Sequence, residues 1–268
     1  MVPATFFTLT LAGLWWEDPP DPEGESTWRF GLPYAWWVMA ILGSHEMGHY
    51  VACRFHRVRA TLPFFIPGIP PIGSFGAVIR IRARIPDRRA LFDIAAAGPI
   101  AGFAVALPVL LVGFLVAEPF DPGDLEGGWS VGPPLLVWFL GDLLVEGTIR
   151  TNHLIGAGWV GMLVTSLNLF PVGQLDGGHI AYALSRRMHR LLARLSLVGL
   201  FSLIVFQVVF LGQAPAYVLW FGILLWMRDR HPRLIDERNV GITRGRKFVA
   251  LVLLAILLLS FIPVPFIF

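Results

Sequence analysis

The sequence is poor in charged residues and in cysteine. Only 15% of its 268 residues are charged, whereas a soluble domain typically carries about 25%. Hydrophobic residues make up 56% of the chain, and the mean hydropathy is +0.68. This composition argues against a soluble globular fold. Cys53 is the single cysteine, which excludes both a disulfide framework and a zinc cluster built from cysteines.

Several familiar functional motifs are also missing. The chain has no glycine-rich phosphate loop, no Ser/His/Asp set and no haem motif. Its formal net charge is +3, but the basic residues are confined to a few segments instead of being spread along the chain. Charge segregated in this way is a topology signal of membrane proteins, so we expect no nucleic-acid partner.

Long hydrophobic runs, by contrast, are plentiful. A helix that crosses the hydrocarbon core of a bilayer needs about 20 mostly apolar residues. Seven runs are candidates for such helices: 1–16, 33–53, 90–117, 152–175, 192–211, 214–227 and 247–268. The further run 135–145 is too short to cross, and we expect an interfacial helix there. The sequence therefore predicts an all-α polytopic membrane protein.

The basic residues predict the orientation of these helices. Segments 54–89, 186–194 and 228–247 hold 19 of the 21 basic residues, and seven spans place all three on one side. The positive-inside rule makes that side cytoplasmic, with the N-terminus inside and the C-terminus outside. Residues 1–16 lack a basic segment and a cleavage site, so we expect no cleavable signal peptide. A prokaryotic cell (inner) membrane is the expected location.

The second hydrophobic run contains His-Glu-Met-Gly-His at residues 45–49, an HExxH motif. On an α-helix His45 and His49 lie one turn apart on the same face, so both imidazoles can bind one zinc ion. Glu46 lies beside them and can take a proton from a zinc-bound water, whose pKa is about 7. The alternative is that these side chains only hydrogen-bond neighbouring helices. Metal binding is favoured, because burying one ionisable group in a membrane costs about 2.5–3.5 kcal/mol.

A catalytic zinc site needs a third protein ligand, and Asp176 is the best candidate. It follows the fourth hydrophobic run, where Pro171 and two glycines are expected to unwind the chain. With seven spans, the second and fourth helices run in the same direction across the membrane. His49 and Asp176 then both fall near the cytoplasmic side, where the three ligands can meet at a similar depth.

Two motifs together resemble a known family. HEMGH on one hydrophobic run, and residues 168–177 fitting NxxPxxxLDG on another, resemble the site-2 protease family of intramembrane zinc metalloproteases. The resemblance implies a six-helix protease core over residues 1–228, followed by a cytoplasmic loop and one C-terminal transmembrane helix in 229–268. No loop is longer than about 36 residues, so we expect neither a PDZ domain nor an appended sensor domain.

The resemblance also implies roles for individual residues. His45, His49 and Asp176 would bind one Zn²⁺ ion per chain, and Glu46 would be the catalytic base. Asn168 would position the substrate carbonyl or stabilise the oxyanion, which its amide N–H can do chemically. Hydrogen bonding between helices is an equally good explanation for Asn168.

Three further features carry structural expectations. His179 is expected to be structural, because three zinc ligands are already assigned. Asp93 lies next to an arginine-rich loop, and we expect it to pair with Arg88 or Arg89. The third hydrophobic run contains GxxxG at residues 98–102, which is typical of close helix packing.

The loop between the second and third runs is unusually apolar. Residues 61–84 contain a Pro/Gly-rich stretch followed by alternation over Phe75–Ile81, which predicts a strand within a short re-entrant element. An exposed strand edge can pair with an unwound substrate segment. A surface loop anchored on lipid is the alternative. The arginines of segment 54–89 are expected to contact anionic membrane lipids.

These features predict an intramembrane zinc metalloprotease. It would hydrolyse peptide bonds in or near transmembrane segments of substrate proteins, close to the cytoplasmic face, as in regulated intramembrane proteolysis. A membrane metal-ion or proton transporter using the same polar residues is the alternative, although a transporter needs polar residues spread across the bilayer. A catalytically inactive binder of membrane helices is disfavoured, because every catalytic residue is present. The sequence carries no signal for a particular oligomeric state.

Overall fold

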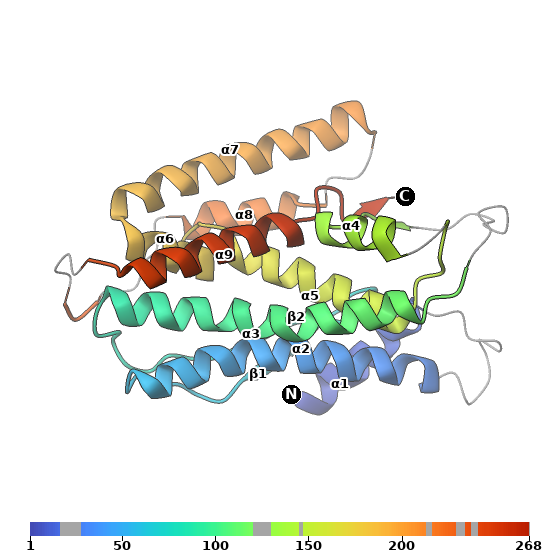
Figure 1. Ribbon diagram of the computed structural model, residues 1–268, viewed down its shortest axis with the longest axis horizontal. Helices are drawn as coiled ribbons and strands as arrows, with labels where there is room; N and C mark the ends of the chain where they lie inside the picture. Colours follow the sequence, from blue (N-terminus) through green and yellow to red (C-terminus); the bar gives the residue numbers. More distant parts are fainter. Residues whose placement is uncertain are drawn as a thin grey trace.

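Helices dominate the computed structural model of the chain, and most of them run along its longest axis (Figure 1). The structure describes residues 1–16, 28–119, 130–144, 147–212, 216–228, 234–236 and 241–267. Its helices are α1 (Val2–Gly13), α2 (Trp28–Phe55), α3 (Arg88–Leu115), α4 (Leu135–Leu144), α5 (His153–Leu169), α6 (Asp176–Leu184), α7 (Arg186–Phe210), α8 (Val218–Met227) and α9 (Arg244–Ser260). Its strands are β1 (Phe64–Pro67), β2 (Ser74–Val78), β3 (Ser130–Val131) and β4 (Phe266–Ile267).

Each of the seven predicted spans overlaps one helix, in the order α1, α2, α3, α5, α7, α8 and α9. Helices α3 and α7 are long and apolar enough to cross a membrane by length and composition, whereas α1, α4, α5 and α8 are shorter apolar helices. The count of seven spans and the interfacial position of α4 therefore stay predictions. Residues 17–27, between the first two predicted spans, lie outside the described residues, as does the start of the segment 229–268.

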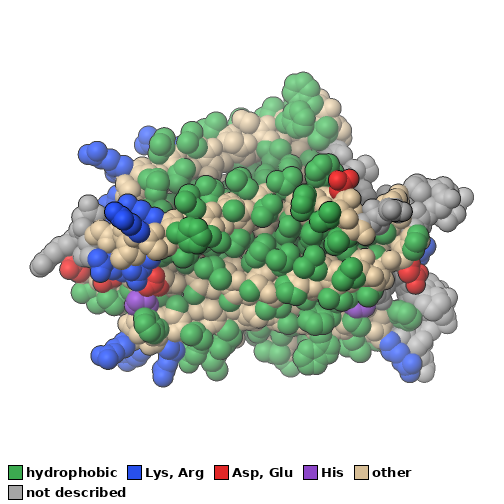
Figure 2. Space-filling model, in the orientation of Figure 1, with side chains coloured by type: hydrophobic (Ala, Val, Ile, Leu, Met, Phe, Trp, Pro, Cys, Tyr) green, Lys and Arg blue, Asp and Glu red, His purple; other side chains and the backbone are tan. Residues whose placement is uncertain are grey.

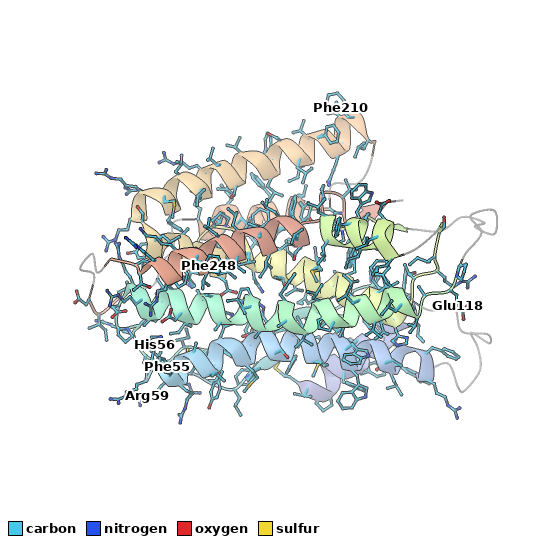
Figure 3. All side chains as sticks on the ribbon, viewed as in Figure 1. Phe55, His56, Arg59, Glu118, Phe210 and Phe248 are labelled. Atoms are coloured by element: carbon cyan, nitrogen blue, oxygen red, sulfur yellow. The ribbon has the colours of Figure 1, made fainter. Side chains whose placement is uncertain are left out.

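Apolar side chains cover the middle of the visible face, and charged side chains gather at its two ends (Figure 2). Most of the Lys and Arg side chains in this view lie where α2 ends and where α3, α7 and α9 begin, which we call the arginine-rich end. Phe55, His56 and Arg59 lie at this end, and Glu118 lies at the opposite one (Figure 3). An apolar belt between two charged ends matches the cross-section of a bilayer. The chain is a membrane protein.

The main hydrophobic core lies between α1, α2, α3 and α5. Its largest fully buried side chains include Tyr34, Leu110 and Trp159. Helices α2 and α3 approach closely, because a Cβ atom on Gly48 would lie only 2.4 Å from the carbonyl oxygen of Ala97. Lipid tails are as apolar as leucine, so membrane helices associate through such close packing of small residues.

The connection between α2 and α3 forms the antiparallel hairpin of β1 and β2. Side chains of the two N-terminal helices hold its tip: the Thr8 hydroxyl donates to the carbonyl of Gly73, and the Tyr34 hydroxyl donates to that of Ile72, each over 2.8 Å. Tyr34 lies 21 residues before Phe55, the last residue of α2, or about 30 Å along the helix. The hairpin therefore extends along most of α2.

The predicted strand Phe75–Ile81 is present in part. Strand β2 begins one residue earlier than predicted and ends at Val78, and Ile81 takes part in an isolated antiparallel bridge with Ala60. A re-entrant position of this hairpin in a bilayer stays a prediction.

The fourth predicted span, 152–175, is not one continuous helix. Helix α5 ends before the segment 170–175, which is not helical, and α6 begins after it. Pro171 disfavours helical geometry at the preceding residue, and Phe170 is accordingly extended, with φ −57° and ψ 129°. The predicted unwinding is confirmed, and the helical part of the predicted span ends at Leu169.

Asp93 pairs with Arg246 of α9, so the predicted pairing with Arg88 or Arg89 is wrong. The Arg246 guanidinium donates to both carboxylate oxygens of Asp93, over 2.8 and 2.7 Å. His56 Nε2 lies 3.0 Å from the same carboxylate. The fold brings α9 beside α3, which no spacing along the sequence indicates.

Candidate metal centre

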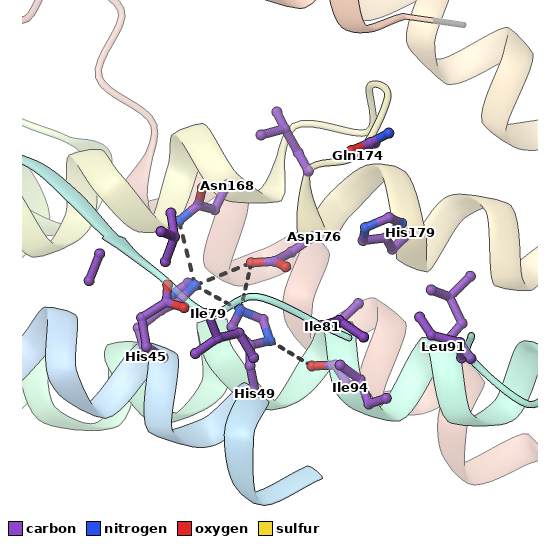
Figure 4. A pocket seen from close by; sticks show the side chains of 16 residues that line it. His45, His49, Ile79, Ile81, Leu91, Ile94, Asn168, Gln174, Asp176 and His179 are labelled. Carbon is purple, nitrogen blue, oxygen red and sulfur yellow. Dashed lines mark hydrogen bonds and ion pairs between the residues drawn. The ribbon is translucent and has the colours of Figure 1, made fainter. Parts of the chain in front are cut away.

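Two histidines and one glutamate of α2 face a cavity inside the helix bundle. His45, Glu46 and His49 are only 3%, 7% and 7% exposed. One helical turn separates the two histidines, and their Nε2 atoms lie 3.1 Å apart (Figure 4). Two ring nitrogens at this distance in a buried site require a proton or a metal ion between them, because their lone pairs otherwise repel each other.

The carboxylate of Asp176 completes a triangle with these nitrogens. Its Oδ2 atom lies 3.2 Å from Nε2 of His45 and 3.3 Å from Nε2 of His49. Asp176 is the first residue of α6. The non-helical segment 170–175, between α5 and α6, lets its side chain face α2 (Figure 4). The structure thus brings together the three residues that the sequence predicts as ligands.

The dimensions of this triangle fit a zinc ion. Tetrahedral zinc binds nitrogen and oxygen at 2.0–2.2 Å, which separates neighbouring donor atoms by roughly 3.3–3.5 Å. The observed separations of 3.1–3.3 Å lie close to that range. Within the described residues, His45, His49 and Asp176 are the group of His, Cys, Asp and Glu side chains that can hold a metal ion.

The backbone of α3 fixes the protonation of one histidine. Nδ1 of His49 lies 2.7 Å from the carbonyl oxygen of Ile94. A carbonyl oxygen can only accept, so Nδ1 carries the proton and Nε2 keeps the lone pair that a metal needs. Such a partner orients the ring and raises its basicity, as the outer shell of zinc sites generally does.

Two glycines of α3 leave room for the histidine rings. A Cβ atom on Gly98 would lie 2.1 Å from Nε2 of His49, and one on Gly102 would lie 3.1 Å from Cβ of His45. The GxxxG motif therefore does more than bring two helices together, since it accommodates the proposed ligands. The sequence contains this signal, but only the fold shows which side chains the glycines face.

Glu46 occupies the position expected of a base beside the metal centre. It lines the same cavity as the triangle, together with Ile79, which follows β2 by one residue. The end of β2 and the predicted base on α2 therefore border the same cavity.

Asn168 lies in the last turn of α5 and also lines the cavity. Its Nδ2 atom lies 3.5 Å from Nε2 of His45 (Figure 4). The amide thus reaches the edge of the triangle. All five predicted site residues line one cavity of about 270 Å³.

The cavity has further walls that sequence reasoning did not assign to the site. Ile79 and Ile81 contribute from the strand side, and Gln174 contributes from the break between α5 and α6. The only sequence signal for Gln174 is its position inside the NxxPxxxLDG segment. His179 lines the cavity one helical turn after Asp176 but is not part of the triangle, so its structural role stays a prediction.

A largely buried triangle of two histidines and one aspartate, beside a glutamate in an apolar helix bundle, is a candidate metal centre within a membrane protein. The chain belongs to peptidase family M50, whose family model matches residues 33–211. The matched segment contains all five predicted site residues. The family predicted from the two sequence motifs is confirmed.

Two curated relatives come from Arabidopsis thaliana. The probable chloroplastic zinc metalloprotease EGY2 is 34% identical over 260 residues, covering 89% of this chain and 43% of the relative. The probable chloroplastic zinc metalloprotease EGY1 is 33% identical over 268 residues, covering 92% of this chain and 46% of the relative. The chain thus spans less than half the length of these relatives. Among solved structures, it is similar to a site-2 protease from Methanocaldococcus jannaschii, with 15% identity, 88% and 90% coverage and a TM-score of 0.41.

Proposed function

We propose that this chain is a zinc-dependent endopeptidase that hydrolyses peptide bonds in or near transmembrane segments of other proteins. The observation that carries the proposal is the triangle of His45, His49 and Asp176, with donor separations of 3.1–3.3 Å and Glu46 beside it. Membership of peptidase family M50 supports the same chemistry. Residues 1–228 would form the proposed catalytic core, and the loop and C-terminal helix predicted in 229–268 would be an addition to it.

His45, His49 and Asp176 would hold one zinc ion, which when bound supplies Lewis-acid activation of a water and of the scissile carbonyl. The Glu46 carboxylate takes the proton of the attacking water and passes it to the leaving amine. Asn168 donates an Nδ2 hydrogen to the substrate carbonyl oxygen as negative charge develops there. The apolar bundle around these groups excludes bulk water, which strengthens each of these interactions.

The hairpin supplies the surface on which a substrate can unwind. A transmembrane helix hides its peptide bonds in its own hydrogen bonds, so it must be extended before cleavage. In the part of the chain that the structure describes, β2 pairs only with β1, and residues 77–79 line the cavity. The free edge of β2 can therefore bind an extended substrate segment through backbone hydrogen bonds, within reach of Glu46.

The proposed cleavage site lies toward the cytoplasmic face. His49 lies six residues, or about 9 Å of helix, before Phe55 at the arginine-rich end. The positive-inside rule makes this end cytoplasmic, which orients the N-terminus inside and the C-terminus outside. Substrates would then be cut near the cytoplasmic end of their membrane segments, as regulated intramembrane proteolysis requires.

Replacing Glu46 by glutamine tests this proposal. The amide has nearly the same shape, so zinc should stay bound, but it cannot accept the proton, and we expect cleavage to fall by about 10²- to 10⁴-fold. The assay uses purified protein with a transmembrane substrate that contains a helix-destabilising Gly, Pro or Asn. Glu118→Gln is the matched control, because it makes the same change at the exposed opposite end (Figure 3).

Two results would contradict the proposal. Cleavage by the Glu46→Gln protein at the rate of the unmodified protein would remove Glu46 as the base. Metal flux across vesicles that depends on Glu46, with no cleavage by either protein, would favour the transporter instead.

A further inference from the structure

A second cavity lies on the far side of α6 from the metal centre. It measures about 740 Å³, within the usual range for ligand pockets. Helix α6, the start of α7 and one side of α9 form its walls, and it is lined mainly by aliphatic side chains. Figure 1 shows that α7 and α9 both begin at the arginine-rich end, so this groove runs inward from that end.

Among the described residues that line the groove, one side chain is cationic. Lys247, the only lysine of the chain, lies in the first turn of α9 and is exposed. Ala250, Leu251, Leu254 and Leu257 follow it on the same side of the helix and line the groove. Leu251 and Leu254 are 65% and 50% exposed, so the groove is open to the apolar surroundings of the bundle.

None of the described residues that line this groove is acidic. Among its described walls, the polar contributions near Lys247 are Ser185, at the start of α7, and the backbone of Gly241 and Ile242. A cation at the membrane surface, followed by an apolar stripe that runs into the membrane, is complementary to a phospholipid with an anionic headgroup and apolar acyl chains. Basic pockets between membrane helices on the cytoplasmic side commonly bind anionic headgroups.

We propose that this groove binds one anionic phospholipid, with its phosphate at Lys247 and an acyl chain along α9. The charge at the mouth selects an anionic headgroup, and the aliphatic walls select a lipid over a free phosphate. The inference does not depend on proteolysis, because lipid binding is measured without substrate. Its failure would therefore leave the proposed protease unaffected.

The groove also touches the elements that carry the metal centre. Leu169 and Gly177, which line it, are the chain neighbours of Asn168 and Asp176. A bound acyl chain would thus brace α5 and α6 from the side opposite the triangle. A lipid bound there would therefore contact the helix that carries Asp176, the proposed third zinc ligand.

Native mass spectrometry of the full purified chain, titrated with phosphatidylglycerol or phosphatidylcholine, tests the charge. We expect one phosphatidylglycerol per chain, bound about five-fold more tightly than phosphatidylcholine, since one cation near a membrane surface contributes about that factor. Lys247→Gln should abolish the difference. Arg59→Gln, which removes the same charge elsewhere at this end (Figure 3), should preserve it. Equal losses in both variants would show diffuse surface attraction and overturn the proposal.

A second pair of variants tests the acyl chain. Ala250→Phe fills the groove and should lower the retention of both lipids, whereas Ala255→Phe, on an exposed part of α9 outside the groove, should not. Unchanged lipid binding in a folded Ala250→Phe protein would overturn the proposal. Displacement of the lipid by an uncharged transmembrane peptide, lost in Ala250→Phe, would assign the groove to a protein helix instead.

Discussion

The two halves of the metal centre are built in opposite ways. His45 and His49 come from successive turns of one 28-residue helix, whose period alone places them on the same face. Asp176 comes from the first turn of a nine-residue helix that follows the non-helical segment 170–175. The first half therefore depends on local geometry, and the second half depends on how α6 packs against its neighbours.

Two glycines show how closely α6 packs in the Asp176 half of the metal centre. A Cβ atom on Gly177 would lie 1.8 Å from the carbonyl oxygen of Leu169, and one on Gly178 would lie 2.5 Å from that of Gly173. Backbone atoms cannot rotate away as the end of a flexible side chain can. The position of Asp176 is therefore set by backbone contacts between α6, the end of α5 and the break that joins them.

Removing a ligand from either half should have the largest effect on metal binding. We expect His45→Ala, His49→Ala and Asp176→Ala each to lower zinc affinity by at least about 10-fold, because losing even an outer-shell partner costs about 10- to 100-fold. Elemental analysis of the purified proteins measures the occupancy. His56→Ala changes a histidine directly after the same helix; it is the control and should retain zinc (Figure 3). Full zinc occupancy in Asp176→Ala would show that the second half contributes no ligand.

Gly177→Ala should have the next largest effect, because it disturbs the Asp176 half of the metal centre and not the histidine half. The new methyl group meets the backbone of α5, so α6 must shift and carry Asp176 away from the histidines. We expect zinc affinity to fall by about 10-fold, the lower end of the outer-shell range, together with a lower thermal midpoint. Gly199→Ala in α7, where a Cβ atom meets nothing within 4 Å, is the control. A Gly177→Ala protein with unchanged zinc affinity would show that Asp176 tolerates movement of its helix.

A smaller, graded effect is expected on the histidine half. Gly98→Ala places a methyl group against the His49 ring at 2.1 Å, whereas Gly102→Ala approaches His45 only to 3.1 Å. The His49 ring can turn only by losing its hydrogen bond to Ile94, so we expect Gly98→Ala to weaken zinc binding several-fold. Gly102→Ala should weaken it less. Competition with a chelator measures both affinities, and the reverse order would contradict this geometry.

Much of the fold is predictable from the sequence because hydrophobic length and charge placement act locally. Each predicted hydrophobic run overlaps a helix, and the proline of the NxxPxxxLDG segment predicts the break before α6. The pairing of Asp93 with Arg246 is not predictable in this way, because 153 residues separate them. Such a contact depends on α9 packing beside α3, and helix spacing carries no information about it.

The site, like the fold, is predictable from the sequence only where local geometry determines it. HEMGH on one helix determines that two imidazoles share a helix face with one carboxylate beside them, because the α-helical period is a property of the backbone. The GxxxG motif in α3 is visible as well, but its glycines could face any neighbour until α2 lies against them. Likewise, Gln174, Ile79 and Ile81 enter the cavity only through the folding of loops around it.

By itself, the sequence determined the class of this protein, its family and the chemical nature of its proposed ligands. Those features follow from composition, hydrophobic period and two short motifs, all of which act within a few helical turns. Only the tertiary structure decided that Asp176 comes within 3.3 Å of both histidines. The physical reason is that α2 and α6 are far apart in the chain, and the distance depends on close packing of α2 against α3 and of α6 against the end of α5, at glycines that leave no room for a methyl group.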